Sequence, residues 1–306
     1  MLREAAKLAY SSALRPLDDR TVTCIDYLRT FARAPNLDAP HLFSEKIQHY
    51  KLYERDQRMP ALVDKLRGKD YVADVLGQSW VTPTLWSGER VTESVLREIA
   101  PPVVLKPNHA SGKIACIRQG ADLRSIARRA NAWLGLDYHL LHREWAYEGA
   151  RRLLLIEPKI GGEGWPIDYK FWVFDGEVRL IQVDKERFAR HTRQFFDRHW
   201  RRLDLAMKYP AGKEAALRPP HLLEMLAGAE RLGADFRFAR IDFYDTPERP
   251  LFGEITFWPE AGLGRFFPAS FDAILGAQWR YPGARSGRER RSAPRRRCLG
   301  QNEDVR

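Results

Sequence analysis

The chain has 306 residues, of which 44% are hydrophobic and 30% are charged, so it can bury a substantial core and is too apolar for a disordered protein. Its three cysteines are far apart and follow no CxxC or Cys/His spacing, which excludes a disulfide-stapled scaffold and a cysteine-ligated zinc site. No apolar run approaches the roughly 18 to 20 residues that cross a bilayer. Arg3, Glu4 and Lys7 stand where a signal peptide needs an apolar segment. We therefore expect a soluble cytoplasmic protein.

The formal net charge is +11, and much of it lies in residues 285–306. This segment has eight arginines, three acidic residues and few apolar ones, so we expect a disordered basic tail. A solvated tail is the simplest interpretation. The alternatives are contact with nucleic acid and contact with an acidic membrane surface, which would place the protein at the inner face of the membrane. We expect no specific nucleic-acid partner.

The first half of the chain is predicted to alternate between helices and short strands. Apolar residues at helical spacing mark the helices, and apolar runs bounded by turn residues mark the strands. In chain order the elements are a helix from near Ser44, a helix at 61–77 closed by Gly77, strands at 81–86, 103–107 and 114–117, and an amphipathic helix at 121–135. The turn-rich loop 108–113 would join two of these strands into a hairpin over a ligand.

The second half is predicted to form an antiparallel sheet. Asp175-Gly176 is a strong hairpin signal between two alternating apolar runs. The predicted elements are strands at 153–156, 168–174 and 178–183, a helix at 220–232, and strands at 238–244 and 251–257 around a turn at 245–250.

The last of these hairpins carries two acidic residues inside apolar strands. Asp242 and Glu254 would be costly to bury without a positive partner. Two carboxylates facing one point suit Mg²⁺, which binds through one or two carboxylates together with phosphate oxygens. Arg240 or Arg179 could instead make the pair a structural salt bridge. The residues alone leave both interpretations open.

Three further segments could contribute to a nucleotide site. Lys106 ends a strand directly before a flexible loop, and an ammonium group beside backbone amides can hold phosphate, although a surface lysine is the commoner case. At residues 156–160 a strand meets Pro158 and two glycines, which exposes backbone groups that could recognise an adenine edge or form a plain loop. Asp168 and Lys170 share one face of a strand, which could also be solvated.

The order of these segments resembles the ATP-grasp superfamily. The resemblance is closer to its teichuronopeptide-biosynthesis (TupA-like) branch and covers about residues 40–276. It is carried by FSEKIQHYKLYERD, LVDKLRGKDYVADVLG, VVLKPNHASGK, HREWAYE, DYKFWVFDGEVRLIQVDKERFARHTRQFFDRHW, RIDFYD and GEITFWPEAGLGRF. It implies an α+β fold in which two α+β subdomains with antiparallel sheets clasp ATP. The implied division is an N-terminal extension at 1–40, subdomains at 41–150 and 151–284, and the tail.

The resemblance also implies roles for individual residues. Lys65 and Lys106 would contact phosphates, loop 108–113 would close over them, and 157–160 would form the adenine hinge. The implied nucleotide-binding residues are Lys65, Lys106, Ser111, Gly112, Glu157, Lys159, Ile160, Asp168 and Lys170. The implied magnesium ligands are Asp242, Glu254 and Thr256, and the implied catalytic residues are Lys106, Arg193 and Arg240.

The sequence departs from the superfamily pattern at three points. Thr256 stands where asparagine is usual, the loop at 108–113 has one glycine where relatives often have two, and Glu260 follows Pro259 where a small residue is expected. These departures bear more on turnover than on the fold.

The function implied is an ATP- and Mg²⁺-dependent ligase that joins a carboxylate to an amine through an acylphosphate. Family context implies small-molecule or glycan-linked substrates in bacterial cell-surface polysaccharide or peptide-glycan biosynthesis. The alternatives are a glycan-modifying transferase or kinase with the same nucleotide site, and a non-catalytic binding module with a basic tail.

Overall fold

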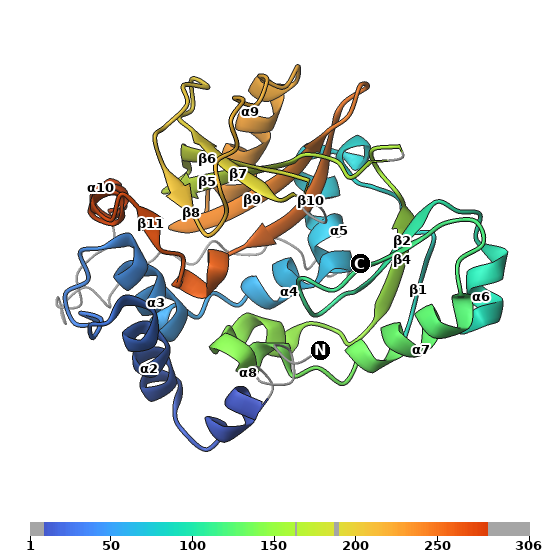
Figure 1. Ribbon diagram of the computed structural model, residues 1–306, viewed down its shortest axis with the longest axis horizontal. Helices are drawn as coiled ribbons and strands as arrows, with labels where there is room; N and C mark the ends of the chain where they lie inside the picture. The colour runs from blue at the N-terminus through green and yellow to red at the C-terminus, as the bar shows by residue number, and fades with distance from the viewer. Residues whose placement is uncertain (1–8, 163, 187–189, 281–306) are drawn as a thin grey trace, which may run out of the picture.

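The computed structural model describes residues 9–162, 164–186 and 190–280, in which two antiparallel sheets are joined and flanked by helices (Figure 1). The strand order is β1-β4-β2-β3 in the smaller sheet and β10-β9-β5-β6-β7 in the larger one, and β11 pairs with β8. The strands are β1 (Trp86–Gly88), β2 (Val103–Pro107), β3 (Ala115–Ile117), β4 (Leu154–Pro158), β5 (Asp168–Phe174), β6 (Glu177–Lys185), β7 (Thr192–Phe196), β8 (Ala206–Met207), β9 (Phe238–Asp245), β10 (Pro250–Thr256) and β11 (Phe266–Phe267). The α+β prediction with antiparallel sheets is confirmed.

The helices cover these sheets and connect them. The α-helices are α2 (Asp19–Phe31), α3 (Phe43–Tyr53), α4 (Met59–Val63), α5 (Lys65–Leu76), α6 (Glu93–Glu98), α7 (Leu123–Trp133), α8 (Tyr138–His142), α9 (Leu222–Gly233) and α10 (Ser270–Gln278), and the 3-10 turns are η1 (Gln78–Trp80), η2 (Trp145–Gly149) and η3 (Pro259–Gly262). Figure 1 shows the two sheets on opposite sides of α5.

The smaller sheet has one apolar and one polar face because its strands alternate. Leu105 and Ile156 are fully buried and belong to a separate small core with Ala130 and Trp133 of α7. Lys106 and Glu157 lie on the opposite face, since Val104 pairs with Glu157 and Lys106 with Leu155. The strand period therefore turns the charged side chains of this sheet away from its own core.

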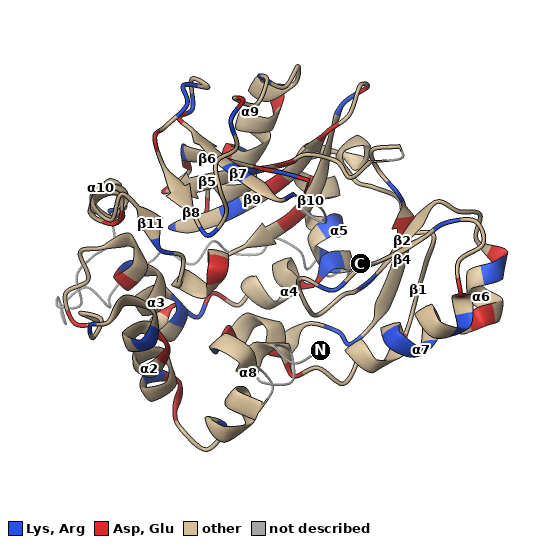
Figure 2. Ribbon diagram, in the orientation of Figure 1, with Lys and Arg blue, Asp and Glu red and all other residues tan. Residues whose placement is uncertain are grey.

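The larger sheet also has two different faces. Ala239, Ile241 and Phe243 of β9 point toward the helix α9 side and are fully buried. On the other face, Trp172 packs against Phe43 with ring centroids 5.3 Å apart, so α3 covers that end of the sheet. The rest of this face carries charged side chains, and Figure 2 shows basic and acidic segments on β9 and β10. One sheet face thus serves partly as core and partly as a polar surface.

The structure differs from the predicted elements at three places. Residues 81–85 are not a strand, because Pro83 lacks the amide hydrogen that a ladder needs, and only Trp86–Gly88 pairs. The helix predicted at 61–77 is two helices, divided at Asp64, which caps the second. The strand predicted at 153–156 begins the second strand-rich region in the sequence, but β4 pairs with β1 and β2 of the smaller sheet.

This pairing also affects the division expected at residue 151. A boundary there would separate β4 from its sheet, while Phe43 and Ile47 of α3 and Met59 and Leu62 of α4 belong to the same core as the larger sheet. The subdomain limits 41–150 and 151–284 therefore do not follow the two hydrophobic cores.

The N-terminal part of the described chain packs against the rest through α2, which contacts α3 and α8. Its residues Val22 and Tyr27 are buried, and Tyr27 shares a hydrogen bond of 2.9 Å with Ser44. Among the described residues no helix is long and apolar enough to cross a membrane. The tail expected at 285–306 lies outside the described residues.

Candidate active site

A cavity of about 220 Å³ lies between the two sheets and α5. The residues expected to bind nucleotide come from α5, β2, β4, β5 and the loops that follow β2 and β4. The lining residues include Lys65, Lys106, Ser111, Gly112, Glu157, Lys159, Ile160, Asp168 and Lys170, together with Asp242 and Glu254. The fold therefore brings all of the expected nucleotide-binding residues to one cavity.

Asp64 connects the start of α5 to the segment that precedes β4. Its carboxylate is fully buried, caps α5 through the amide of Arg67 at 3.0 Å, and accepts two hydrogen bonds of 2.9 Å from the guanidinium of Arg151. Although burial raises it, the pKa of Asp64 falls to about 2 because of the hydrogen bonds from Arg151 and the backbone. Asp64 is thus an ionised anchor for the start of α5.

Lys65, the next residue, ties this anchor to the loop at 108–113. Its ammonium group donates a hydrogen bond of 2.7 Å to the carbonyl of Ala110, and the Asn108 side chain accepts one of 3.0 Å from the amide of Leu66. Burial lowers the pKa of Lys65 to about 8. Lys65, which is expected to contact phosphates, therefore also holds the loop 108–113, which is expected to close over them.

Glu157 is paired with two lysines rather than one. Its carboxylate lies 2.6 Å from the ammonium of Lys106 and also forms an ion pair with Lys69. Although burial raises the pKa of Glu157, Lys106 and Lys69 together hold it below its usual value. Lys106 lines the cavity, whereas Lys69 approaches from α5 and donates a hydrogen bond of 2.9 Å to Thr84.

The hinge after β4 is a closed turn stabilised by Lys159. The Lys159 ammonium donates hydrogen bonds to the carbonyls of Gly162, at 2.5 Å, and Gly164, and it lies 5.5 Å from the ring centroid of Trp165. Trp165 also lines the cavity. Lys159 therefore shapes the hinge loop, and the wall beside it is aromatic.

A β-bulge places the two acidic residues of the last hairpin side by side. Phe252 pairs with Phe243 and Glu254 pairs with Asp242, so Gly253 is one extra residue in β10. A Cβ at Gly253 would lie 3.1 Å from the carbonyl oxygen of Asp242, which favours glycine at this close approach. The bulge puts Glu254 on the same face as Asp242.

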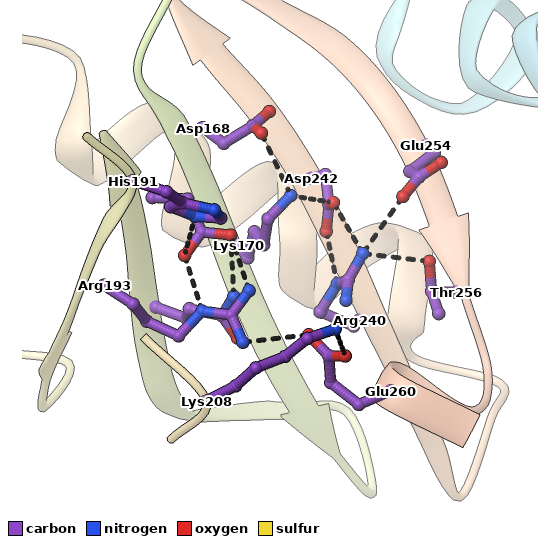
Figure 3. Close-up of polar contacts among 12 residues, drawn as sticks. Asp168, Lys170, His191, Arg193, Lys208, Arg240, Asp242, Glu254, Thr256 and Glu260 are labelled. Carbon is purple, nitrogen blue, oxygen red and sulfur yellow. Dashed lines mark hydrogen bonds and ion pairs between the residues drawn. The ribbon is translucent and has the colours of Figure 1, made fainter. Parts of the chain in front are cut away.

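Three oxygen-bearing side chains on this face converge on one nitrogen of Arg240 (Figure 3). The Nη2 atom lies 2.7 Å from Asp242 Oδ2, 3.0 Å from Glu254 Oε1 and 3.1 Å from Thr256 Oγ1. Lys170 Nζ is 2.5 Å from Asp242 Oδ2, and burial raises the pKa of Asp242. Of the two partners weighed from the sequence, Arg240 makes the ion pair, whereas Arg179 pairs with Glu177 on β6.

The convergence bears on the expected magnesium site. Asp242, Glu254 and Thr256 offer hard oxygen donors around a single point that a cationic nitrogen occupies, so this donor set fits Mg²⁺ once Arg240 moves. Within the described parts of the chain, no three acidic, histidine or cysteine residues gather as a metal-binding group. An ion here would need further oxygens from phosphates and water.

A second cavity, of about 900 Å³, adjoins the first. The lining residues that the two cavities share are Ser111, Gly112, Lys113, Lys170, His191, Tyr209 and Glu254. Three of the expected site residues, Arg193, Arg240 and Thr256, line this second cavity and are not among the lining residues of the first. The site therefore has a smaller and a larger compartment, which meet at the loop 108–113, at the pair His191 and Tyr209, and at the acidic hairpin.

Arg193 is held in the second cavity by acidic side chains from two elements (Figure 3). Its guanidinium binds Asp184 of β6 at 2.7 and 3.0 Å and Glu260 of η3 at 2.9 Å, and Lys208 binds Glu260 at 2.6 Å. Although burial raises it, the pKa of Glu260 falls to about 2 because of Arg193 and Lys208. Glu260, an unexpected residue in the sequence, is thus a bridge between the sheet and η3.

Sequence reasoning did not find Lys69, His191 or Tyr209. Lys69 lies four residues after Lys65, a spacing that puts both on one face of α5, and this signal was present in the sequence. His191 and Tyr209 line both cavities and stack with ring centroids 3.7 Å apart. Their meeting depends on the path of residues 197–208, for which no local pattern exists.

Comparison with known proteins gives a family match and weak structural likenesses. The TupA-like ATP-grasp family model matches residues 45–280. D-alanine–D-alanine ligase from Bacillus anthracis is 18% identical with a TM-score of 0.41, over 64% of this chain and 57% of the ligase. The corresponding ligase from Helicobacter pylori is 15% identical with a TM-score of 0.43, over 79% and 70%. The ATP-grasp ligase PsnB with a minimal precursor is 12% identical with a TM-score of 0.38, over 65% and 54%. No curated protein matches significantly.

Proposed function

Because the chain belongs to the TupA-like ATP-grasp family, we propose that it is an ATP- and Mg²⁺-dependent ligase that joins a carboxylate to an amine through an acylphosphate. The observation that supports this best is that one cavity between the two sheets is lined by every residue that the family resemblance assigns to nucleotide binding. The chain spans 57% of the B. anthracis ligase it resembles, so the activity of that enzyme is not transferred as a whole.

The proposed nucleotide role divides among three groups of residues. Lys65 and Lys106 would neutralise phosphate charge, and the loop at 108–113 would supply backbone amides above them. The hinge at 157–160, with Trp165 as a wall, would hold the adenine. Asp242, Glu254 and Thr256 would hold Mg²⁺, which when bound offsets charge on the phosphates during transfer.

The second cavity is the proposed site of the carboxylate and amine substrates. Arg240 lines the second cavity beside Glu254, which lines both cavities, and it would bind the substrate carboxylate once it leaves Asp242 and Glu254. Arg193 is fixed by Asp184 and Glu260, so it would offer a preorganised positive charge at the opposite wall. The volume of about 900 Å³ accommodates a ligand much larger than a single amino acid.

The first test is Mg²⁺-dependent ATP binding, measured by calorimetry on the wild type and on Glu254→Gln. This nearly isosteric change removes one proposed metal charge. Glu248→Gln is the matched control, since Glu248 lies in the exposed turn of the same hairpin. We expect the wild type and the control to bind ATP with Mg²⁺ and Glu254→Gln to lose the magnesium dependence. Absence of ATP binding by the wild type would contradict the proposal.

ADP release with paired substrates would then identify the reaction. A ligase requires both a carboxylate and an amine, whereas a kinase or transferase would release ADP with a hydroxyl acceptor and no amine. The proposed setting is cytoplasmic synthesis of bacterial cell-surface polysaccharide or peptide-glycan, with small-molecule or glycan-linked substrates. Activity only on substrates unrelated to these would contradict the setting and leave the ligase chemistry intact.

A further inference from the structure

We propose that Lys69 is a positioning residue of the nucleotide site: it is the permanent counter-ion of Glu157 and thereby frees Lys106 to bind phosphate. The proposal rests on the nucleotide role of this cavity stated above. The site roles that the family resemblance implies do not include Lys69, and Lys69 does not line the cavity of about 220 Å³. It contacts Glu157 from α5. Its effect on the ligand would pass through Glu157 and Lys106.

The geometry around Glu157 distinguishes its two partners. The Glu157 side chain is 6% exposed and pairs with Lys106 through one oxygen and with Lys69 through the other. Lys106 is 19% exposed and lines the cavity, while Lys69 is 9% exposed and is fixed by Thr84. Of the two lysines, only Lys106 is therefore placed to exchange its partner for a ligand.

The energetics of a buried carboxylate explain why two cations are needed. Leaving a buried charge without a partner is strongly unfavourable. If Lys106 alone compensated Glu157, phosphate binding would leave that carboxylate unpaired or would require it to take up a proton. With Lys69 in place, Glu157 stays ionised when Lys106 turns to the phosphates. The second lysine thus removes a penalty from nucleotide binding.

Glu157, its two lysine partners and the nearby Lys65 come from three elements. Lys65 and Lys69 lie on α5, Lys106 on β2 and Glu157 on β4. Burial lowers the pKa of Lys69, opposed chiefly by Glu157, and Lys65 also senses both Lys106 and Glu157. The tests below therefore compare variants that share Lys65 and Lys106, so that the contributions of these residues cancel.

The decisive measurement is ATP binding by calorimetry at pH 8 in two buffers of different ionisation enthalpy, which gives both affinity and protons taken up. For Lys69→Met we expect roughly tenfold or greater weakening and up to about one additional proton taken up relative to wild type. Lys69→Arg should restore both values. Arg67→Met, an exposed change on the same helix, should behave as wild type. A purely structural role of Lys69 would not change the proton count.

A double variant connects the effect to Glu157. Lys69→Met combined with Glu157→Gln leaves no lone buried charge, so it should fold even if Lys69→Met does not, and it should bind ATP as tightly as Glu157→Gln alone. A tenfold difference between these two would overturn the role of Lys69, as would wild-type affinity and proton count in a folded Lys69→Met. Absence of ATP binding by the wild type would overturn the nucleotide proposal and this inference with it.

Discussion

Asp64 offers the sharpest test of how the nucleotide site is anchored. We expect Asp64→Asn to destabilise the folded protein, because it keeps an oxygen that can cap α5 but loses the charge paired with Arg151. Asp64→Ala should cost more, because it also removes the cap. Asp122→Asn is the matched control: Asp122 caps α7 through the amide of Ser125 but is exposed.

The magnitude follows from the pKa of Asp64, which drops from 3.8 to about 2 on folding. A shift of this size corresponds to roughly 2 kcal/mol for Asp64→Asn at pH 7, and the lost cap adds about 1 kcal/mol for Asp64→Ala. Since the folded-state pKa is lowered, the stabilisation is complete above the unfolded pKa near 4 and disappears as the pH falls through 2. About half of it should remain at pH 3.

The assay is urea unfolding followed by tryptophan fluorescence, at pH 7 and pH 3, with Arg151→Met as the second member of a double-mutant cycle. Relative to wild type, Asp64→Asn should lose clearly less stability at pH 3 than at pH 7. In the Arg151→Met background, Asp64→Asn should cost much less stability at pH 7 than it does in the wild type. The interpretation of Asp64 as an ionised anchor is refuted if Asp64→Asn is within about 0.5 kcal/mol of wild type at pH 7, or if its deficit is equal at both pH values.

Three further predictions concern other parts of the site. Gly262→Ala should destabilise the protein by about 2 kcal/mol or more in thermal unfolding. The φ angle of Gly262 is +71°, and a new Cβ would lie 2.3 Å from the Ile47 side chain. Gly120→Ala is the control and should lose less stability, because its new Cβ meets open space. ATP affinity should fall as the pH rises through about 8, because Lys65 then loses its proton; Lys65→Met should flatten that profile, and an unchanged profile would exclude Lys65 as the titrating group. Glu260→Gln should weaken binding of the substrate that occupies the larger cavity and leave the ATP dissociation constant within about twofold, since Glu260 lines only that cavity. An equal loss of affinity for both ligands would contradict the assignment of ATP and substrate to separate cavities.

Local patterns predicted the parts of the fold in which neighbours in sequence are neighbours in space. The hairpin of β9 and β10 follows from two apolar runs around a Pro-containing turn, but the pairing of Asp242 with Glu254 depends on the bulge at Gly253, which these runs do not show. Strand parity also puts Arg240 on the face of Asp242, two residues away, which favours Arg240 over Arg179 as the partner. The sequence left both open because it does not show which face of β6 is exposed.

The features that were missed depend on contacts between distant segments. The apolar run of β4 could pair with either sheet, and only the packed structure shows that it lies between β1 and β2. Likewise, Lys69 is an ordinary helix residue until α5 packs beside β4, which brings Glu157 to it. Neither the pairing of β4 nor the packing of α5 can be predicted from a short stretch of sequence, because helix and strand propensity and hydrophobic periodicity do not specify which surfaces meet.

The bulge at Gly253 makes the acidic pair depend on backbone pairing as well as on residue type. If β10 kept a regular alternation after Phe252 with all of its residues, Gly253 would stand opposite Asp242, and Glu254 would stand opposite Ile241 and point to the α9 side of the sheet. No charged group would have been substituted, yet the acidic pair would be divided between opposite faces. A substitution at Gly253 that straightens β10 would thus separate Glu254 from Asp242 without changing any side chain that forms the pair.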